Sequence, residues 1–163
     1  MKSLNYLLSA AVLVFLLANA SCKSDDDPGV PAADQVGAKF TSTWNASSVT
    51  FGSPSQDRSA DYSDFQLTIG YTAGTNAGTY SITGGPQGSG IVPFAGNGTW
   101  SFQNEITDAN PSSFNIVRND GLVITVSSLT DTSLQLSFVF DDGTHSSSRT
   151  EAVDGTWTFD FSK

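Results

Sequence analysis

The residues that could supply a nucleophile and a base are few, and they lie in loop-like sequence. His145 is the one histidine of the chain, and hydroxyl residues flank it at Thr144 and at 146–148. Hydrolysis by an activated hydroxyl needs such a base beside the nucleophile. Ser89 lacks the strand-to-helix turn that exposes a hydrolase serine, and the glycine-rich stretch 84–90 lacks the lysine and following helix of a phosphate-binding loop. We therefore expect plain loops here, and a protein that is not an enzyme.

Acidic side chains are the other candidates for chemistry. Asp141 and Asp142 are adjacent in a turn-like segment, where we expect solvated carboxylates rather than a spaced acid–base pair. Asp57, Asp61 and Asp64 are close in sequence, but no glycine-bearing loop with calcium-ligand spacing accompanies them. One Cys and one His exclude multi-cysteine and two-histidine metal sites. We expect no metal and no cofactor.

Charge and length narrow the class further. The 163 residues carry 16 acidic against 7 basic side chains, which gives a formal net charge of −9. Binding to nucleic acid requires a basic face, so we expect no nucleic-acid partner. The length suits one folded domain, and a single cysteine forms no intramolecular disulfide.

The first residues, 1–21, have the plan of a cleaved secretory signal peptide. Lys2 gives a positive start, residues 4–18 carry no charge and are rich in Leu, Val, Phe and Ala, and small residues follow. An uncleaved transmembrane anchor is the alternative. The apolar stretch is shorter than the ~20 residues that a membrane span needs, so we favour cleavage.

Cys22 directly follows this leader. The preceding string Ala18-Asn19-Ala20-Ser21 resembles the lipobox of bacterial lipoproteins, whose cysteine carries fatty acyl chains such as palmitate. Stable membrane attachment takes two or more such chains. The resemblance therefore implies that Cys22 is a lipid anchor and that the membrane is a partner of the protein.

A short polar segment comes next. It consists of Lys23, Ser24, Asp25, Asp26 and Asp27. The segment resembles the acidic export signal of surface lipoproteins in Bacteroidetes-type bacteria, which implies an outer-membrane location at the cell surface. Because Pro28, Gly29 and Pro31 follow, we expect residues 22–37 to comprise the lipidated cysteine and a flexible acidic linker.

From residue 38 onward, short runs alternate apolar and polar residues. The clearest stripe is Leu134, Leu136, Phe138 and Phe140, and similar alternation occurs at 65–71, 100–103, 114–117, 122–126 and 157–161. A period of two indicates strands with one buried face. Helical periodicity is confined to at most a short turn at Gln35–Ala38.

Turn residues separate these runs. Asn119-Asp120-Gly121 and Asp141-Asp142-Gly143 favour tight hairpins, and Asn97-Gly98 precedes the Trp100 strand. About eight strands at this spacing predict an all-β domain over 38–163. We expect an antiparallel up-and-down barrel, which leaves no exposed sheet edge, and keep a β-sandwich as the alternative.

Three tryptophans lie in related strings. Gly98-Thr99-Trp100-Ser101-Phe102 is similar to Gly155-Thr156-Trp157-Thr158-Phe159, and Ser42-Thr43-Trp44 is a weaker copy. We favour convergent strand chemistry over duplication. In order with 64–68, 78–80 and 129–134, these strings resemble the lipocalin-like domains of Bacteroidetes lipoproteins. The resemblance covers most of residues 38–162 and implies an eight-stranded up-and-down barrel with no settled general function.

The aromatic residues allow two kinds of interior. Three Trp and eleven Phe could line a ligand cavity or fill a core, and a barrel of eight strands permits either. We expect Trp100 and Trp157 to fill the core. With no catalytic set, we expect a non-catalytic binding module for an apolar or glycan ligand or an envelope partner. The alternative is a structural component of an envelope complex with no small ligand, which an exposed apolar patch and the absence of a cavity would favour.

Overall fold

The fold was analysed in a computed structural model, which describes residues 29–86, 93–94, 96–141 and 154–163. The elements in chain order are α2 (Ala32–Phe40), β1 (Ser42–Phe51), β2 (Gln56–Asp57), the 3-10 helix η1 (Ser59–Tyr62), β3 (Gln66–Thr72), β4 (Ala77–Thr83), β5 (Gly98–Phe102), β6 (Phe114–Arg118), β7 (Val123–Leu129), β8 (Ser133–Phe140) and β9 (Gly155–Ser162).

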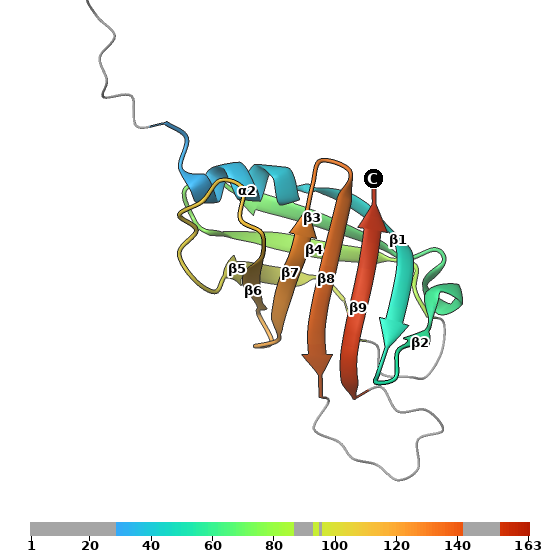
Figure 1. Ribbon diagram of the computed structural model, residues 1–163. Coiled ribbons are helices and arrows are strands. Elements are labelled where there is room, and N and C mark those ends of the chain that lie inside the picture. The colour runs from blue at the N-terminus through green and yellow to red at the C-terminus, as the bar shows by residue number, and fades with distance from the viewer. Residues whose placement is uncertain (1–28, 87–92, 95, 142–153) are drawn as a thin grey trace, which may run out of the picture.

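The strands form one closed antiparallel barrel. Neighbours in the sheet follow the order β1-β3-β4-β5-β6-β7-β8-β9, and β1 also pairs with β9, which closes the ring. The two-residue strand β2 extends the sheet beside the end of β1. The predicted all-β up-and-down barrel is confirmed, and the β-sandwich alternative is excluded because the first and last strands are hydrogen-bonded to each other (Figure 1).

Alternation along each strand divides the barrel into an inner and an outer surface. Leu134, Leu136 and Phe138 of β8 are buried, whereas the residues between them are partly or fully exposed. The other long strands repeat this pattern except β1, where a register shift between Ala46 and Ser48 separates the buried Trp44 and Val49, and the buried residues form one core cluster. Charged residues within strands are limited, in the described part of the chain, to Asp57, Arg118 and Asp160.

The β6–β7 connection is the tight hairpin that the sequence predicts. Gly121 has a φ of 87°, a conformation that side chains with a Cβ rarely adopt. Its N–H donates to the carbonyl of Arg118 at 2.9 Å. Of the Asp141-Asp142-Gly143 turn, residues 142 and 143 lie outside the described residues.

Helix α2 closes one end of the barrel, here called the helix end (Figure 1). It buries Val36, Gly37 and Phe40. Phe40 packs edge-on against Trp100 with ring centroids 5.2 Å apart, and its carbonyl accepts a 3.0 Å hydrogen bond from the indole of Trp44. The helix begins within the range 22–37 that we assigned to the lipidated cysteine and a flexible linker.

A carboxylate fixes α2 to the sheet. Asp34 Oδ1 accepts hydrogen bonds from the Tyr71 hydroxyl at 2.7 Å and from the N–H of Gly74 at 2.8 Å. These bonds hold the pKa of Asp34 below its usual value, the Gly74 bond having the larger effect. Burial and the bond to Asp34 raise the pKa of Tyr71 to about 12.

The opposite end of the barrel, here called the far end, is formed by the connections β1–β3, β4–β5, β6–β7 and β8–β9. It follows from the antiparallel order that these four connections share one end while the β3–β4, β5–β6 and β7–β8 connections lie at the helix end. The described chain also enters the fold at the helix end, at the start of α2 (Figure 1).

Candidate functional site

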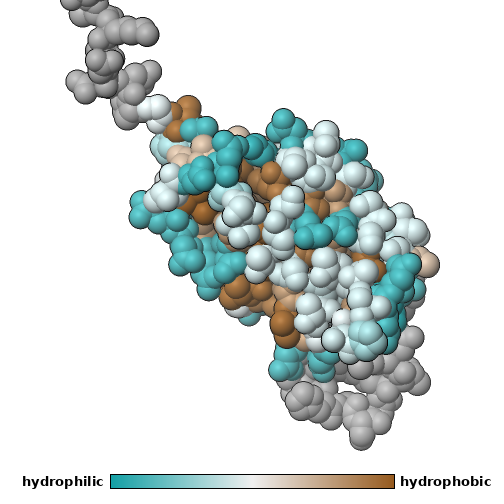
Figure 2. Space-filling model, in the orientation of Figure 1, coloured by the Kyte–Doolittle hydropathy of each residue, from teal (hydrophilic) through white to brown (hydrophobic). Residues whose placement is uncertain are grey.

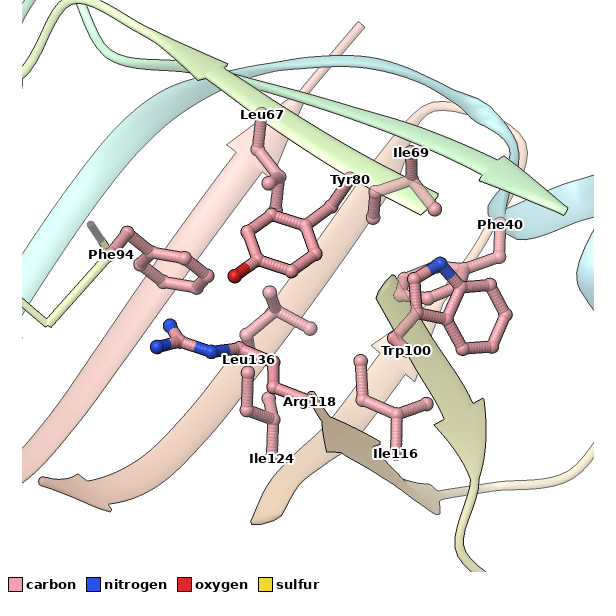
Figure 3. A pocket seen from close by; sticks show the side chains of 10 residues that line it. All are labelled: Phe40, Leu67, Ile69, Tyr80, Phe94, Trp100, Ile116, Arg118, Ile124 and Leu136. Atoms are coloured by element: carbon pink, nitrogen blue, oxygen red, sulfur yellow. The ribbon is translucent and has the colours of Figure 1, made fainter. Parts of the chain in front are cut away.

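The barrel interior is a candidate ligand site, but side chains of the described residues occupy most of it. Between α2 and the far end lies a cavity of about 20 Å³. Figure 3 shows the side chains around it: Phe40, Leu67, Ile69, Tyr80, Phe94, Trp100, Ile116, Arg118, Ile124 and Leu136. A cavity needs roughly 10–15 Å³ to hold one water molecule, whereas ligand pockets measure roughly 300–1,000 Å³. Among the described residues, this cavity therefore has room for a single water molecule and none for a lipid or a sugar.

Arg118 is the one buried charged side chain within the described residues, at 5% exposure. Its Nε donates to Asp120 Oδ1 at 3.1 Å, its Nη2 donates to Asp120 Oδ2, and its Nη1 donates to the carbonyl of Pro93 at 2.8 Å. The guanidinium also lies 5.6 Å from the ring centroids of both Tyr80 and Phe94, within cation–π range. The hydrogen bonds from Arg118 hold the pKa of Asp120 below its usual value.

Phe94 closes the interior towards the far end. Its ring is 3% exposed and meets Phe138 and Phe159 edge-on, each at a centroid distance of 5.3 Å. Because Arg118 binds the carbonyl of the preceding residue, Pro93, the guanidinium fixes the backbone that carries this ring. Arg118 and Phe94 together therefore close the cavity on the side of the far end.

The sequence did not lead us to predict this arrangement, although it contains part of the signal. Phe114, Ile116 and Arg118 alternate along β6, so the arginine occupies an inward position of the strand. An inward charge next to an Asp-Gly turn indicates a carboxylate partner within reach. Nothing in the local pattern identifies Phe94, because its neighbours Pro93 and Gly96 give no strand periodicity.

The three acidic residues considered for calcium each bind a group of the protein itself. Asp57 Oδ1 accepts from the N–H and hydroxyl of Ser59, which lowers the pKa of Asp57, the hydroxyl bond having the larger effect. Asp61 pairs with Arg58 at 2.7 Å, and Asp64 Oδ1 accepts from the N–H of Gly85 at 2.9 Å. The described part of the chain holds no group of three or more Asp, Glu, His or Cys residues arranged to bind a metal ion.

Several predicted residues lie outside the described part of the chain. These are Cys22, Lys23, Ser24, Asp25, Asp26, Asp27, Ser89, Asp142, Thr144, His145 and the serines at 146–148. The lipid anchor, the export signal and the loop interpretation of the histidine therefore stay predictions. Among the described helices, none is long and apolar enough to cross a membrane.

The tryptophans lie where we expected them. Trp44, Trp100 and Trp157 are between 0% and 3% exposed and belong to the core. Trp100 packs against Phe40 at the helix end, whereas Trp157 packs against Phe51, with ring centroids 4.6 Å apart, near the far end. The two similar Gly-Thr-Trp strings thus fill different parts of the barrel.

The outer surface carries the cavities that are open to a partner. One of about 190 Å³ lies in the connection between β5 and β6, and one of about 90 Å³ lies between that connection and α2. Comparison with known proteins identifies no relative, since no family model, curated protein or solved structure matches the chain.

Proposed function

We propose that this chain is a lipoprotein anchored in the outer membrane through Cys22, whose barrel is a non-catalytic module that docks with an envelope partner through its outer surface. The observation that carries the proposal is the filled interior. The described residues inside the barrel enclose a cavity of about 20 Å³, which is too small for an apolar or glycan ligand. Of the two roles expected from the sequence, it favours the accessory component over the carrier of a small ligand.

The residues on the outer surface determine which chemical groups a partner must present. Strand positions that face outwards carry mostly Ser, Thr, Asn and Gln, and Figure 2 shows a mainly pale and teal surface with scattered brown residues. The large apolar side chains exposed in the described part of the chain are Val30, Val123 and Val139. Single exposed valines do not form a hydrophobic docking patch, so of the two features expected for the accessory role the described residues show the small cavity and not the apolar patch. We therefore infer recognition through polar and charged groups.

The position of α2 supports anchoring from the helix end. Because the segment after Cys22 joins the described fold at α2, a lipid on Cys22 would attach the barrel to the membrane through the helix end.

Metabolic labelling tests the anchor. Cells that express the full chain are fed an alkynyl palmitate, and the purified protein is assayed for the label, with Cys22→Ser as the control. We expect label in the wild type and none in the variant, together with cleavage of the domain by protease added to intact cells. An unlabelled wild type, or equal label in both proteins, would overturn the anchor.

A second measurement tests the filled interior. We expect no saturable binding of a fluorescent fatty acid by the Cys22→Ser chain. Stoichiometric binding would instead favour the carrier role, with the ligand inside the barrel.

A further inference from the structure

Helix α2 covers the helix end of the barrel without belonging to its sheet. The ring of strands closes through the pairing of β1 with β9, and α2 takes no part in that hydrogen bonding. Only Thr41 separates the end of α2 from the start of β1. The barrel is therefore closed in its own right, and α2 is a plug seated in one of its ends (Figure 1).

Beneath this plug lies a floor of aromatic rings. Tyr71 and Phe102 each pack against Trp100, with ring centroids 6.0 and 5.2 Å apart. Phe114 packs against Phe102 at 5.6 Å. Phe40 of α2 inserts among them and meets Trp100 and Phe114 edge-on, at 5.2 and 5.9 Å. Departure of the helix would uncover this aromatic floor, which is spread over β3, β5 and β6, while the strands stay paired.

The contacts of α2 with the barrel follow one another along the helix. Asp34, in the first turn, accepts from the Tyr71 hydroxyl at 2.7 Å and from the N–H of Gly74 at 2.8 Å. Phe40, the last residue, holds the other end through its fully buried ring. A pull on the chain that precedes Ala32 therefore loads these contacts one after another, beginning at Asp34.

The strands resist the same pull differently. In an antiparallel sheet the hydrogen bonds run perpendicular to the strands, so a pull along a strand loads many of them at once. Strand β8, for example, pairs with β9 along its whole length, from Ser133 to Phe140. Contacts that break in sequence yield at a lower force than contacts that must break together. Because parts of one fold can open separately, α2 should leave before the barrel unfolds.

We propose that α2 is a force-released plug: tension on the segment before Ala32 withdraws the helix and opens the aromatic floor while the barrel stays folded. The inference rests on the proposed anchoring, in which the lipid on Cys22 stays in the membrane while a partner holds the outer surface. It adds a regulatory step to that function, because docking under load presents apolar rings that the unloaded protein hides.

A single-molecule force measurement tests the order of release. It uses the full Cys22→Ser chain, which has no other cysteine. One handle is attached at Val30→Cys, directly before α2, and the other at Val139→Cys, at the far end of β8; both side chains are exposed, at 64% and 65%. We expect a short first extension that releases the nine residues of α2, roughly 30 Å of extended chain, and barrel unfolding at higher force. The first extension should reverse when the load is lowered.

A matched pair of handles bypasses the plug. Thr43→Cys, at an exposed position of β1, replaces Val30→Cys, and the second handle is unchanged. Load then enters the barrel beyond α2, so the first extension should be lost. In the Val30 geometry, Asp34→Ala should lower the force of the first extension and leave that of barrel unfolding unchanged. Asp131→Ala, at an exposed acid of the β7–β8 turn, should change neither force.

The apolar dye ANS tests whether the aromatic floor becomes accessible. Bound to the uncovered rings, it should lengthen the time that α2 stays out after the load is lowered. Loss of α2 only together with the barrel, a first extension in both handle geometries, an unchanged first force in Asp34→Ala, or a return that ANS does not slow would each overturn the force-released plug. None of these results affects palmitate labelling of Cys22, which tests the anchor independently.

Discussion

Gly37 of α2 lies directly against the Tyr71 ring of β3, and its replacement tests how the helix closes the barrel. An alanine Cβ at this position would lie 2.4 Å from two atoms of the Tyr71 ring. Ordinary carbon contacts are about 3.5–4.0 Å long, so the helix or the ring must move by roughly 1 Å. We expect Gly37→Ala to lower the free energy of unfolding.

Two effects of opposite sign set the size of that change. Alanine favours a helix over glycine by up to about 1 kcal/mol, which stabilises the variant. Overpacking a tight contact costs about 1–3 kcal/mol, and displacement of Tyr71 also weakens its 2.7 Å hydrogen bond to Asp34, which is worth about 1 kcal/mol. The sum is a net destabilisation of about 1–2 kcal/mol.

Urea titration monitored by tryptophan fluorescence measures this change in the free energy of unfolding, because Trp44 and Trp100 lie against the C-terminal end of α2. The decisive control is the Tyr71→Ala background, in which the ring is absent. There Gly37→Ala should instead stabilise by about 0.5–1 kcal/mol, from helix propensity alone. If Gly37→Ala stabilises the wild type, or costs the same in both backgrounds, then the helix does not pack on Tyr71 as described.

Three further predictions concern the interior and the acid behaviour. Phe94→Ala removes a ring that is 3% exposed, and urea titration should show the free energy of unfolding reduced by about 2–4 kcal/mol. Calorimetry should detect benzene binding to this variant that the wild type lacks. If no benzene binds, the space left by the ring has collapsed. Arg118→Ala leaves the buried Pro93 carbonyl without its donor and should reduce the free energy of unfolding by about 2–4 kcal/mol. Asp120→Asn changes a side chain that is 48% exposed and should reduce it by about 1 kcal/mol. Equal losses in the two variants would refute the role given to Arg118 in closing the interior. Because the pKa of Asp34 is lowered in the folded state, its contribution to stability is complete above its unfolded pKa of about 3.9 and is lost as the pH falls through the folded pKa. The stability of the wild type should therefore decrease more steeply below about pH 4 than that of Asp34→Asn. Parallel pH profiles of the two proteins would contradict this.

The barrel could be predicted because its information is local and repeated. Most strands show the alternation that places Leu134, Leu136 and Phe138 of β8 on one face, and the Asp120-Gly121 turn marks the hairpin between β6 and β7. Up-and-down connectivity then follows from adjacency, since neighbouring strands in the chain are neighbours in the sheet. Closure is the one non-local step, and it depends on β1 pairing with β9.

The sequence indicated helix α2 only as a short turn at Gln35–Ala38, and its full length escaped prediction for a physical reason. Its nine residues bury only Val36 and Phe40 as large side chains, an i, i+4 pair too short to reveal helical periodicity. Gly37 in its middle lowers helix propensity, yet the close approach to Tyr71 requires a residue without a Cβ. Tertiary packing therefore stabilises α2, whose formation the local helix propensity of its residues does not predict.

The filled interior was left open by the sequence because the same alternating apolar residues line a cavity or fill a core. What decides between them is non-local. Helix α2 inserts Phe40 at one end, and the β4–β5 connection inserts Phe94 at the other, so the space between them shrinks to about 20 Å³. Both rings come from segments without strand periodicity.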